Sequence, residues 1–240
     1  MENKVVIITG GSSGIGAATA IVFAENGYDV AITYKDNIAG AEDLSEKIKA
    51  LGQKVVVVEA DLRLEDEAKK IVDEVTKELG RVDVLVNNAG GYIKGDEWDG
   101  SFDAWIDTFK QNIVSVMNMS KYVCKIFEQQ QSGVIVNIAS RYSVSGNPEA
   151  PAYSAAKSGV VNLTQSYAKL LAPFGRANSI SPAAANAGYW LSAPKDELEA
   201  TISKSPFGKL VEPKEVAGLV LFLASDKASK ITGQNILIGN

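Results

Sequence analysis

The chain has 240 residues, of which 46% are hydrophobic, so it can bury one sizeable core and lies within the size range of a single α/β domain. Its formal net charge of −5 offers no attraction to nucleic acid or to an anionic membrane surface, and we expect neither as a partner. With no histidine and one cysteine, the chain lacks the imidazole base of Ser-His-Asp and Cys-His catalysis, the usual ligands of zinc, and any intrachain disulfide. Carboxylates alone can hold a hard cation, but no tight acidic cluster marks such a site, so we predict no metal.

Short runs rich in Val and Ile recur along the chain and predict buried β-strands. The first run is too short for a signal peptide or a membrane span, and we expect a cytoplasmic location. Stretches with helical spacing, such as residues 39–51 and 64–79, separate the runs. This alternation predicts one α/β domain over residues 1–240, with a doubly wound, seven-stranded parallel sheet covered by helices on both faces. The predicted strands are residues 4–9, 29–33, 54–59, 82–86, 134–138, 177–180 and 235–238.

A glycine-rich turn, Thr9-Gly10-Gly11-Ser12-Ser13-Gly14-Ile15-Gly16, follows the first strand and opens the helical pattern of residues 17–26. Without a Cβ, Gly10 can turn sharply off the strand, while Gly14 and Gly16 let the backbone approach a pyrophosphate at the helix N-terminus. Glycines in a loop are by themselves weak evidence, but a turn between the first strand and the first helix is the context that a dinucleotide site needs.

The spelling Thr-Gly-x-x-x-Gly-x-Gly resembles the short-chain dehydrogenase/reductase family, including its 3-oxoacyl-thioester reductases, and further motifs extend the resemblance over nearly the whole chain. Asn87-Asn88-Ala89-Gly90 matches the family's sheet-stabilising and cofactor-lining turn, and Asp61 matches an acid that contacts the adenine amino group. The resemblance implies a Rossmann-like fold and a reaction between a nicotinamide cofactor and a carbonyl or alcohol. The cofactor contacts that it implies are Gly10, Ser12, Ser13, Gly14, Ile15, Gly16, Tyr34, Lys35, Asp61, Leu62, Asn88, Ala89, Gly90, Tyr153, Lys157, Pro182, Ala183 and Ala185.

Asn112, Ser140, Tyr153 and Lys157 match the family's catalytic set in order and spacing. The resemblance makes Tyr153 the general acid in reduction and the general base in oxidation. Ser140 would bind the substrate oxygen, Lys157 the nicotinamide ribose, and Asn112 a water that relays protons to Lys157. Taken singly, Tyr153 and Lys157 could be an ordinary pair on an exposed helix face, and Ser140 a turn residue. The agreement of all the motifs favours catalysis.

A free tyrosine, with a pKa of about 10, holds its proton too tightly for base catalysis near neutrality. A lysine ammonium at roughly 4 Å, in an effective dielectric near 20, contributes about 4 kcal/mol, which is enough to bring the pKa down to that range. The spacing of Tyr153 and Lys157 therefore predicts a lowered phenol pKa.

Cofactor preference depends on the residue that ends the second strand, where NAD-preferring enzymes usually carry an acid that binds the adenosine ribose. That residue is Tyr34, and Lys35 follows it with a charge that suits a 2′-phosphate. We predict NADP(H), with NAD(H) as the alternative, because Asp36 would partly cancel that charge and Lys35 could simply be solvated.

A segment of small residues and prolines from about residue 183 to 206 is expected to form a substrate loop, either a mobile lid or a long surface connection. It departs from the family pattern, since Ala183 replaces a glycine and Ala187 a threonine that contacts the nicotinamide end of the cofactor. The usual ending Val-Asp-Gly-Gly is also replaced, by Ile238-Gly239-Asn240.

Two functions remain open at this point. The first is an oxidoreductase acting on a ketone, keto ester, 3-oxoacyl thioester or secondary alcohol, which the intact Ser140, Tyr153 and Lys157 favour. The second is a catalytically weak dinucleotide-binding sensor or assembly subunit, which the altered residues 183–187 favour. In either case we expect a homo-oligomer, a dimer or a tetramer, packed through the helices near residues 102–127 and 152–171.

Overall fold

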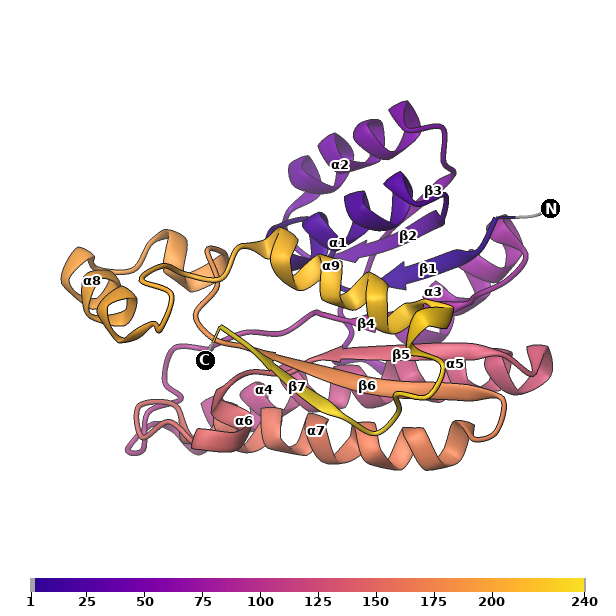
Figure 1. Cartoon of the computed structure of the whole chain (residues 1–240). Helices are drawn as coiled ribbons and strands as arrows, with labels where there is room; N and C mark the ends of the chain where they lie inside the picture. Colours follow the sequence, from indigo (N-terminus) through magenta and orange to yellow (C-terminus); the bar gives the residue numbers. More distant parts are fainter. Residues whose placement is uncertain (1–2, 240) are drawn as a thin grey trace.

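The computed structural model describes residues 3–239, so Asn240 of the altered ending lies outside the described residues. Seven parallel strands form one sheet in the order β3-β2-β1-β4-β5-β6-β7, with helices on both faces (Figure 1). The predicted doubly wound fold is confirmed, and β6 is longer than predicted at both ends. The strands are β1 (Val5–Ile8), β2 (Asp29–Tyr34), β3 (Val55–Glu59), β4 (Val84–Asn87), β5 (Gly133–Ile138), β6 (Gly175–Pro182) and β7 (Asn235–Ile238).

Helices form most of the connections between the strands, and some of these helices, such as that at residues 195–204, are not predicted from the sequence. The principal α-helices are α1 (Gly14–Glu25), α2 (Ile38–Ala50), α3 (Glu65–Leu79), α4 (Phe102–Phe109), α5 (Ser115–Gln130), α7 (Pro151–Leu171) and α9 (Pro213–Ala224). Shorter elements are the π-helix η1 (Lys110–Val114), α6 (Tyr142–Ser145), the 3₁₀ turns η2 (Gly188–Leu191) and η3 (Asp226–Ala228), and α8 (Lys195–Lys204). Within residues 3–239, no helix combines the length and the apolar character needed to cross a bilayer.

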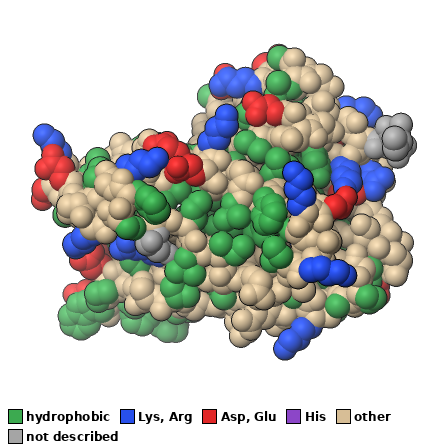
Figure 2. Space-filling view, in the orientation of Figure 1, with side chains coloured by type: hydrophobic (Ala, Val, Ile, Leu, Met, Phe, Trp, Pro, Cys, Tyr) green, Lys and Arg blue, Asp and Glu red, His purple; other side chains and the backbone are tan. Residues whose placement is uncertain are grey.

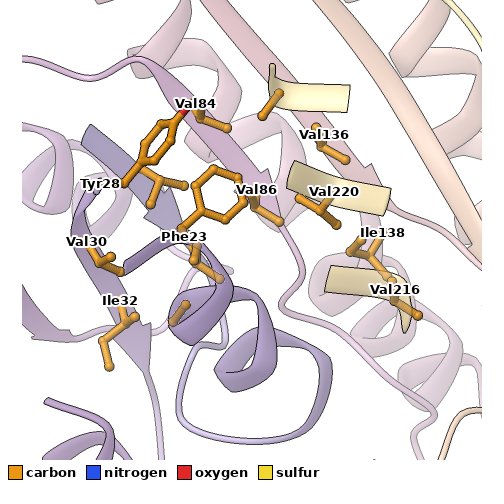
Figure 3. Packing of buried hydrophobic residues seen from close by; sticks show 14 of the residues in the cluster. Phe23, Tyr28, Val30, Ile32, Val84, Val86, Val136, Ile138, Val216 and Val220 are labelled. Carbon is orange, nitrogen blue, oxygen red and sulfur yellow. The ribbon is translucent and has the colours of Figure 1, made fainter. Parts of the chain in front are cut away.

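The sheet separates two hydrophobic layers because successive side chains of a strand point to opposite faces. Val6 and Ile8 of β1 belong to the cluster under α1, α2 and α9, whereas Val5 and Ile7 belong to the cluster under α3, α5 and α7. All four are completely buried, which explains why β1 is a continuous apolar run. Figure 3 shows part of the first cluster, in which side chains of α1 and α9 pack against side chains of β2, β4 and β5.

The order of strands reverses at the centre of the sheet, where β2 and β3 lie to one side of β1 and β4 to the other. Ligands of open α/β sheets bind outside the carboxyl ends of the strands at such a point. The glycine-rich turn follows β1 and the Asn88-Ala89-Gly90 turn follows β4, so both end at this crevice.

The expected substrate loop contains more regular structure than predicted, since residues 183–206 include η2 and α8. A short parallel bridge between Ala185 and Val211 closes the base of this segment. Beyond the bridge, α8 buries none of its residues and lies apart from the sheet (Figure 1). A helix with no buried residues can move without disturbing the core, which a lid would require.

Candidate active site

A cleft of about 1000 Å³ opens at the carboxyl ends of the central strands. Its wall includes residues from the glycine-rich turn, from the ends of β2 and β4, from α7 and from the segment 183–190. Every residue of the predicted site lines this cleft except Gly16 and Asn112. These two lie directly behind the wall, where Gly16 contacts Gly10 and Asn112 contacts Gly91.

The glycine-rich turn needs glycine for two separate reasons. Gly10 has φ +63° and Gly14 has φ +55°, a backbone conformation that strains any other residue. Gly16 is required by close packing, because a Cβ there would lie 2.2 Å from the carbonyl oxygen of Gly10. Helix α1 begins at Gly14, earlier than predicted, so Gly14 and Gly16 belong to the first turn, whose free backbone N–H groups are suited to binding an anion.

Side chains from neighbouring strands hold this turn in place. The Thr9 hydroxyl accepts the backbone N–H groups of Asn88 and Ala89, each at 2.9 Å. In return, the Asn88 amide donates to the carbonyl oxygens of Thr9 and Gly10, at 2.9 and 3.0 Å. These reciprocal bonds join the ends of β1 and β4, so the two turns are fixed relative to each other.

Ser140, Tyr153 and Lys157 meet at the other end of the cleft. The Ser140 side chain hydrogen-bonds to the Tyr153 phenol, and the Lys157 ammonium lies 5.8 Å from the centre of the Tyr153 ring. Lys157 is 3% exposed, and its Nζ donates to the carbonyl oxygen of Ile138 at 2.9 Å. Burial lowers the pKa of Lys157 to about 8.

The predicted lowering of the Tyr153 pKa is wrong for this arrangement of side chains. Burial raises the pKa of Tyr153 to about 12, and the hydrogen bond with Ser140 opposes that rise only in part. The Lys157 ammonium is directed to the Ile138 carbonyl oxygen, so it does not provide the close contact assumed from the sequence. The phenol is therefore protonated at neutral pH. This is the state that a general acid needs before it can donate a proton.

Asn112 lies in the π-helix between α4 and α5 and is completely buried. Its Oδ1 accepts the N–H of Gly91 at 2.9 Å, and its Nδ2 donates to the carbonyl oxygens of Gly91 and Thr108. A Cβ on Gly90 would lie 2.6 Å from the Asn112 Oδ1 and 3.3 Å from the Lys157 Nζ. Asn112 and Lys157 thus both lie close to Gly90. A π-helical turn such as the one that carries Asn112 is frequent at functional sites.

The ends of β2 and β3 place two cations around one acid. Asp61 lies 3.2 Å from Lys35, and Arg63 contacts both its carboxylate oxygens, at 2.9 and 3.0 Å through Nε. These contacts hold the pKa of Asp61 well below its usual range. Arg63 was not predicted, because nothing in the sequence shows that a residue two positions after Asp61 folds back onto it.

Aromatic side chains connect η2 to the loop after β4. The Tyr92 and Tyr189 rings pack edge to face with centroids 6.2 Å apart, and Tyr189 also packs against Trp190. Ala187, one of the departures from the family pattern, lies beside the glycine-rich turn, because a Cβ on Gly14 would meet its Cβ at 3.0 Å. Ala187 and Tyr189 therefore approach opposite ends of the cleft.

Comparisons with known proteins agree with this geometry. A family profile described as Enoyl-(Acyl carrier protein) reductase matches residues 10–239. The 3-oxoacyl-(acyl-carrier-protein) reductase FabG of Thermotoga maritima is 35% identical, over 98% of this chain and 96% of the relative. The cis-4-hydroxycyclohexanecarboxylate dehydrogenase of Sinomonas cyclohexanicum is also 35% identical, over 96% of this chain and 92% of the relative.

Solved structures extend the likeness to three dimensions. The structure of gox2181 has a TM-score of 0.93 and 32% identity, and covers 99% of this chain and 95% of its own. The acetoin dehydrogenase YohF from Salmonella typhimurium has a TM-score of 0.88 and 32% identity, over 98% of this chain and 95% of its own. The chain therefore belongs to the short-chain dehydrogenase/reductase family and is an NAD(P)-dependent oxidoreductase.

Proposed function

We propose that this oxidoreductase reduces the carbonyl group of a small ketone, keto ester or 3-oxoacyl thioester with NADPH. The observation that carries the proposal is the meeting of Ser140, Tyr153 and Lys157 in the same cleft as the glycine-rich turn. The relatives named as 3-oxoacyl-(acyl-carrier-protein) reductase and as acetoin dehydrogenase both fit carbonyl chemistry of this kind.

The cleft fits a dinucleotide. The glycine-rich turn leaves no room for side chains at Gly10 and Gly16, so the backbone itself would hold the pyrophosphate. Asn88, Ala89 and Gly90 would line the nicotinamide side, and Lys157 would hold the ribose hydroxyls. When bound, the cofactor supplies the hydride for the reaction.

The side chains of the proposed site would orient the substrate and move its proton. Ser140 would donate a hydrogen bond to the carbonyl oxygen, and Tyr153 would donate the proton that completes the alcohol. The raised pKa of Tyr153 keeps the phenol protonated, which suits reduction. Asn112 would support Lys157 through water, so that the proton lost by Tyr153 is replaced.

The preference for NADPH rests on charge at the adenine end. Lys35 and Arg63 both form ion pairs with Asp61, and Tyr34 occupies the position where NAD-preferring enzymes carry an acid. A 2′-phosphate would meet two cations here, and Arg63 adds a planar group that suits phosphate geometry.

The test is replacement of Tyr153 with phenylalanine, which removes only the hydroxyl. We expect Tyr153→Phe to lower kcat by a factor on the order of 100 to 10,000 for ketones and acyl thioesters, followed through NADPH absorbance. NADPH binding, followed by fluorescence, should change little. Tyr122→Phe is a matched control, because that hydroxyl bonds to Glu65 on the surface.

An unchanged kcat in Tyr153→Phe would refute the role of the phenol. If the wild-type protein binds NADPH tightly and reduces none of the ketones and acyl thioesters tested, the sensor or assembly function becomes the better account.

A further inference from the structure

The helix that carries Tyr153 and Lys157 has no cap within its own sequence. Helix α7 follows Ala150, whose side chain carries no acceptor, and its first turn contains Pro151. The first N–H groups of a helix find no partner inside it and need acceptors from elsewhere. Tyr153 lies in this first turn, so the position of its phenol depends on how the turn is held.

A carboxylate from a distant loop supplies the acceptor. Asp96 Oδ2 accepts the backbone N–H of Tyr153 at 2.9 Å, and the N–H of Ala152 also stabilises the carboxylate. Asp96 is 0% exposed, and its Oδ1 has no hydrogen-bond partner among residues 3–239. Burying a charge with an unused oxygen costs free energy that a neutral cap such as Ser would avoid. That cost favours a role beyond helix stability.

The loop that carries Asp96 is held on both sides. Gly95 has φ +94°, and a Cβ on Gly100 would lie 2.0 Å from the Gly95 carbonyl oxygen, so the turn is tight. The Trp105 indole N–H donates to the carbonyl oxygen of Glu97 at 3.1 Å, which joins the loop to α4. These contacts fix Asp96 at the N-terminus of α7.

We propose that Asp96 is a positioning residue, which caps the N-terminus of α7 and thereby holds Tyr153 against Ser140. The inference rests on the proposed function of Tyr153. Lys157 lies one turn further along the helix and has its own anchor at the Ile138 carbonyl oxygen. Loss of the cap should therefore displace the proton donor more than the residue proposed to bind the cofactor.

The test compares Asp96→Ala with Asp96→Asn, which keeps an acceptor oxygen, and with Asp99→Ala, an exposed aspartate of the same loop. Misplacing a reacting group by about 1 Å can cost a factor on the order of 100. We expect Asp96→Ala to lower kcat by about 10 to 100 fold, with KM for NADPH within about twofold of wild type. Asp96→Asn should recover most of kcat, and Asp99→Ala should match wild type.

Two further measurements keep the inference testable. If the alanine variant does not fold, Asp96→Leu replaces it, because leucine is close to aspartate in shape but has no acceptor. We expect the same loss of kcat from Asp96→Leu. Hydrogen exchange at the amides of Ala152 and Tyr153 should accelerate in the variants without an acceptor, whether or not the protein turns over a substrate. The exchange result therefore separates failure of the cap from failure of the proposed function.

Two results would overturn the proposal. One is a folded variant without an acceptor whose kcat stays within about twofold of wild type. The other is Asp96→Asn as slow as Asp96→Ala, since an acceptor at that position would then be irrelevant.

Discussion

Lys35 provides the test of cofactor preference at the scale of single residues. Its ammonium is half-exposed and lies 3.2 Å from Asp61, so it can turn toward a phosphate without a large desolvation cost. A charge-assisted hydrogen bond contributes about 1.5 kcal/mol, which corresponds to roughly a tenfold change in affinity. We expect Lys35→Ala to raise KM for NADPH about tenfold and to leave KM for NADH unchanged.

Steady-state kinetics with both cofactors measure this effect. Lys77→Ala is the control, because it removes an exposed lysine charge in the last turn of α3. Equal changes in the two Michaelis constants would contradict a contact between Lys35 and the 2′-phosphate.

Single residues also show where prediction from the sequence ends. The positions of Ser140, Tyr153 and Lys157 could be predicted because family motifs fix their spacing. The direction of the Tyr153 pKa shift could not, since it depends on burial and on a hydrogen bond from Lys157 to the backbone of β5. Asp96 was missed for a similar reason, because its partner lies 57 positions away in the chain.

At the scale of elements, the glycine-rich turn depends on the packing of Gly16. A methyl group at this position would be forced against the Gly10 carbonyl oxygen at 2.2 Å and against the Asn88 amide at 2.6 Å. We expect Gly16→Ala to destabilise the fold by about 1 to 3 kcal/mol and to weaken NADPH binding at least about tenfold, because the turn must open. Thermal unfolding and fluorescence titration measure the two effects.

Gly218→Ala is the matched control within a helix. Gly218 is exposed in the middle of α9, and a Cβ there would meet nothing within 4 Å. Alanine should raise stability by about 0.5 to 1 kcal/mol through its helix propensity and leave the cofactor affinity unchanged. A Gly16→Ala variant that binds NADPH as tightly as Gly218→Ala would show that the turn tolerates a side chain.

Elements with strong periodicity were predictable, and those shaped by tertiary contacts were not. All seven strands were found, most of them because buried parallel strands are rich in Val and Ile; β6, with a single Ile, has the weakest such pattern. The start of α1 was placed too late, since two glycines in the first turn hide the helical pattern. Helix α8 was missed because it buries no residues, so it has no apolar stripe to reveal it.

At the scale of the whole molecule, apolar side chains remain exposed on two separate faces. One face lies on the helices predicted to pack between subunits, where Phe102 is 72% and Met117 is 46% exposed. The other lies around α9 and the edge strand β7, where Figure 2 shows hydrophobic side chains gathered at the centre of the view. Phe222 and Leu237 on these two elements are 37% and 45% exposed. This second face was not predicted, because it combines elements that only the folded sheet brings together.

Two different self-complementary faces are what a tetramer with three twofold axes requires, whereas a dimer requires one. We expect the wild-type protein to sediment as a dimer or a tetramer, and Met117→Asp to reduce its size, because a twofold interface receives each new charge twice. Ile38→Asp is the control, since Ile38 is 53% exposed on α2, away from both faces. If Leu237→Asp also reduces the size and the double variant is monomeric, both faces are used. A wild-type protein that sediments as a monomer, or a Met117→Asp variant of unchanged size, would show that the helices near residues 102–127 do not pair.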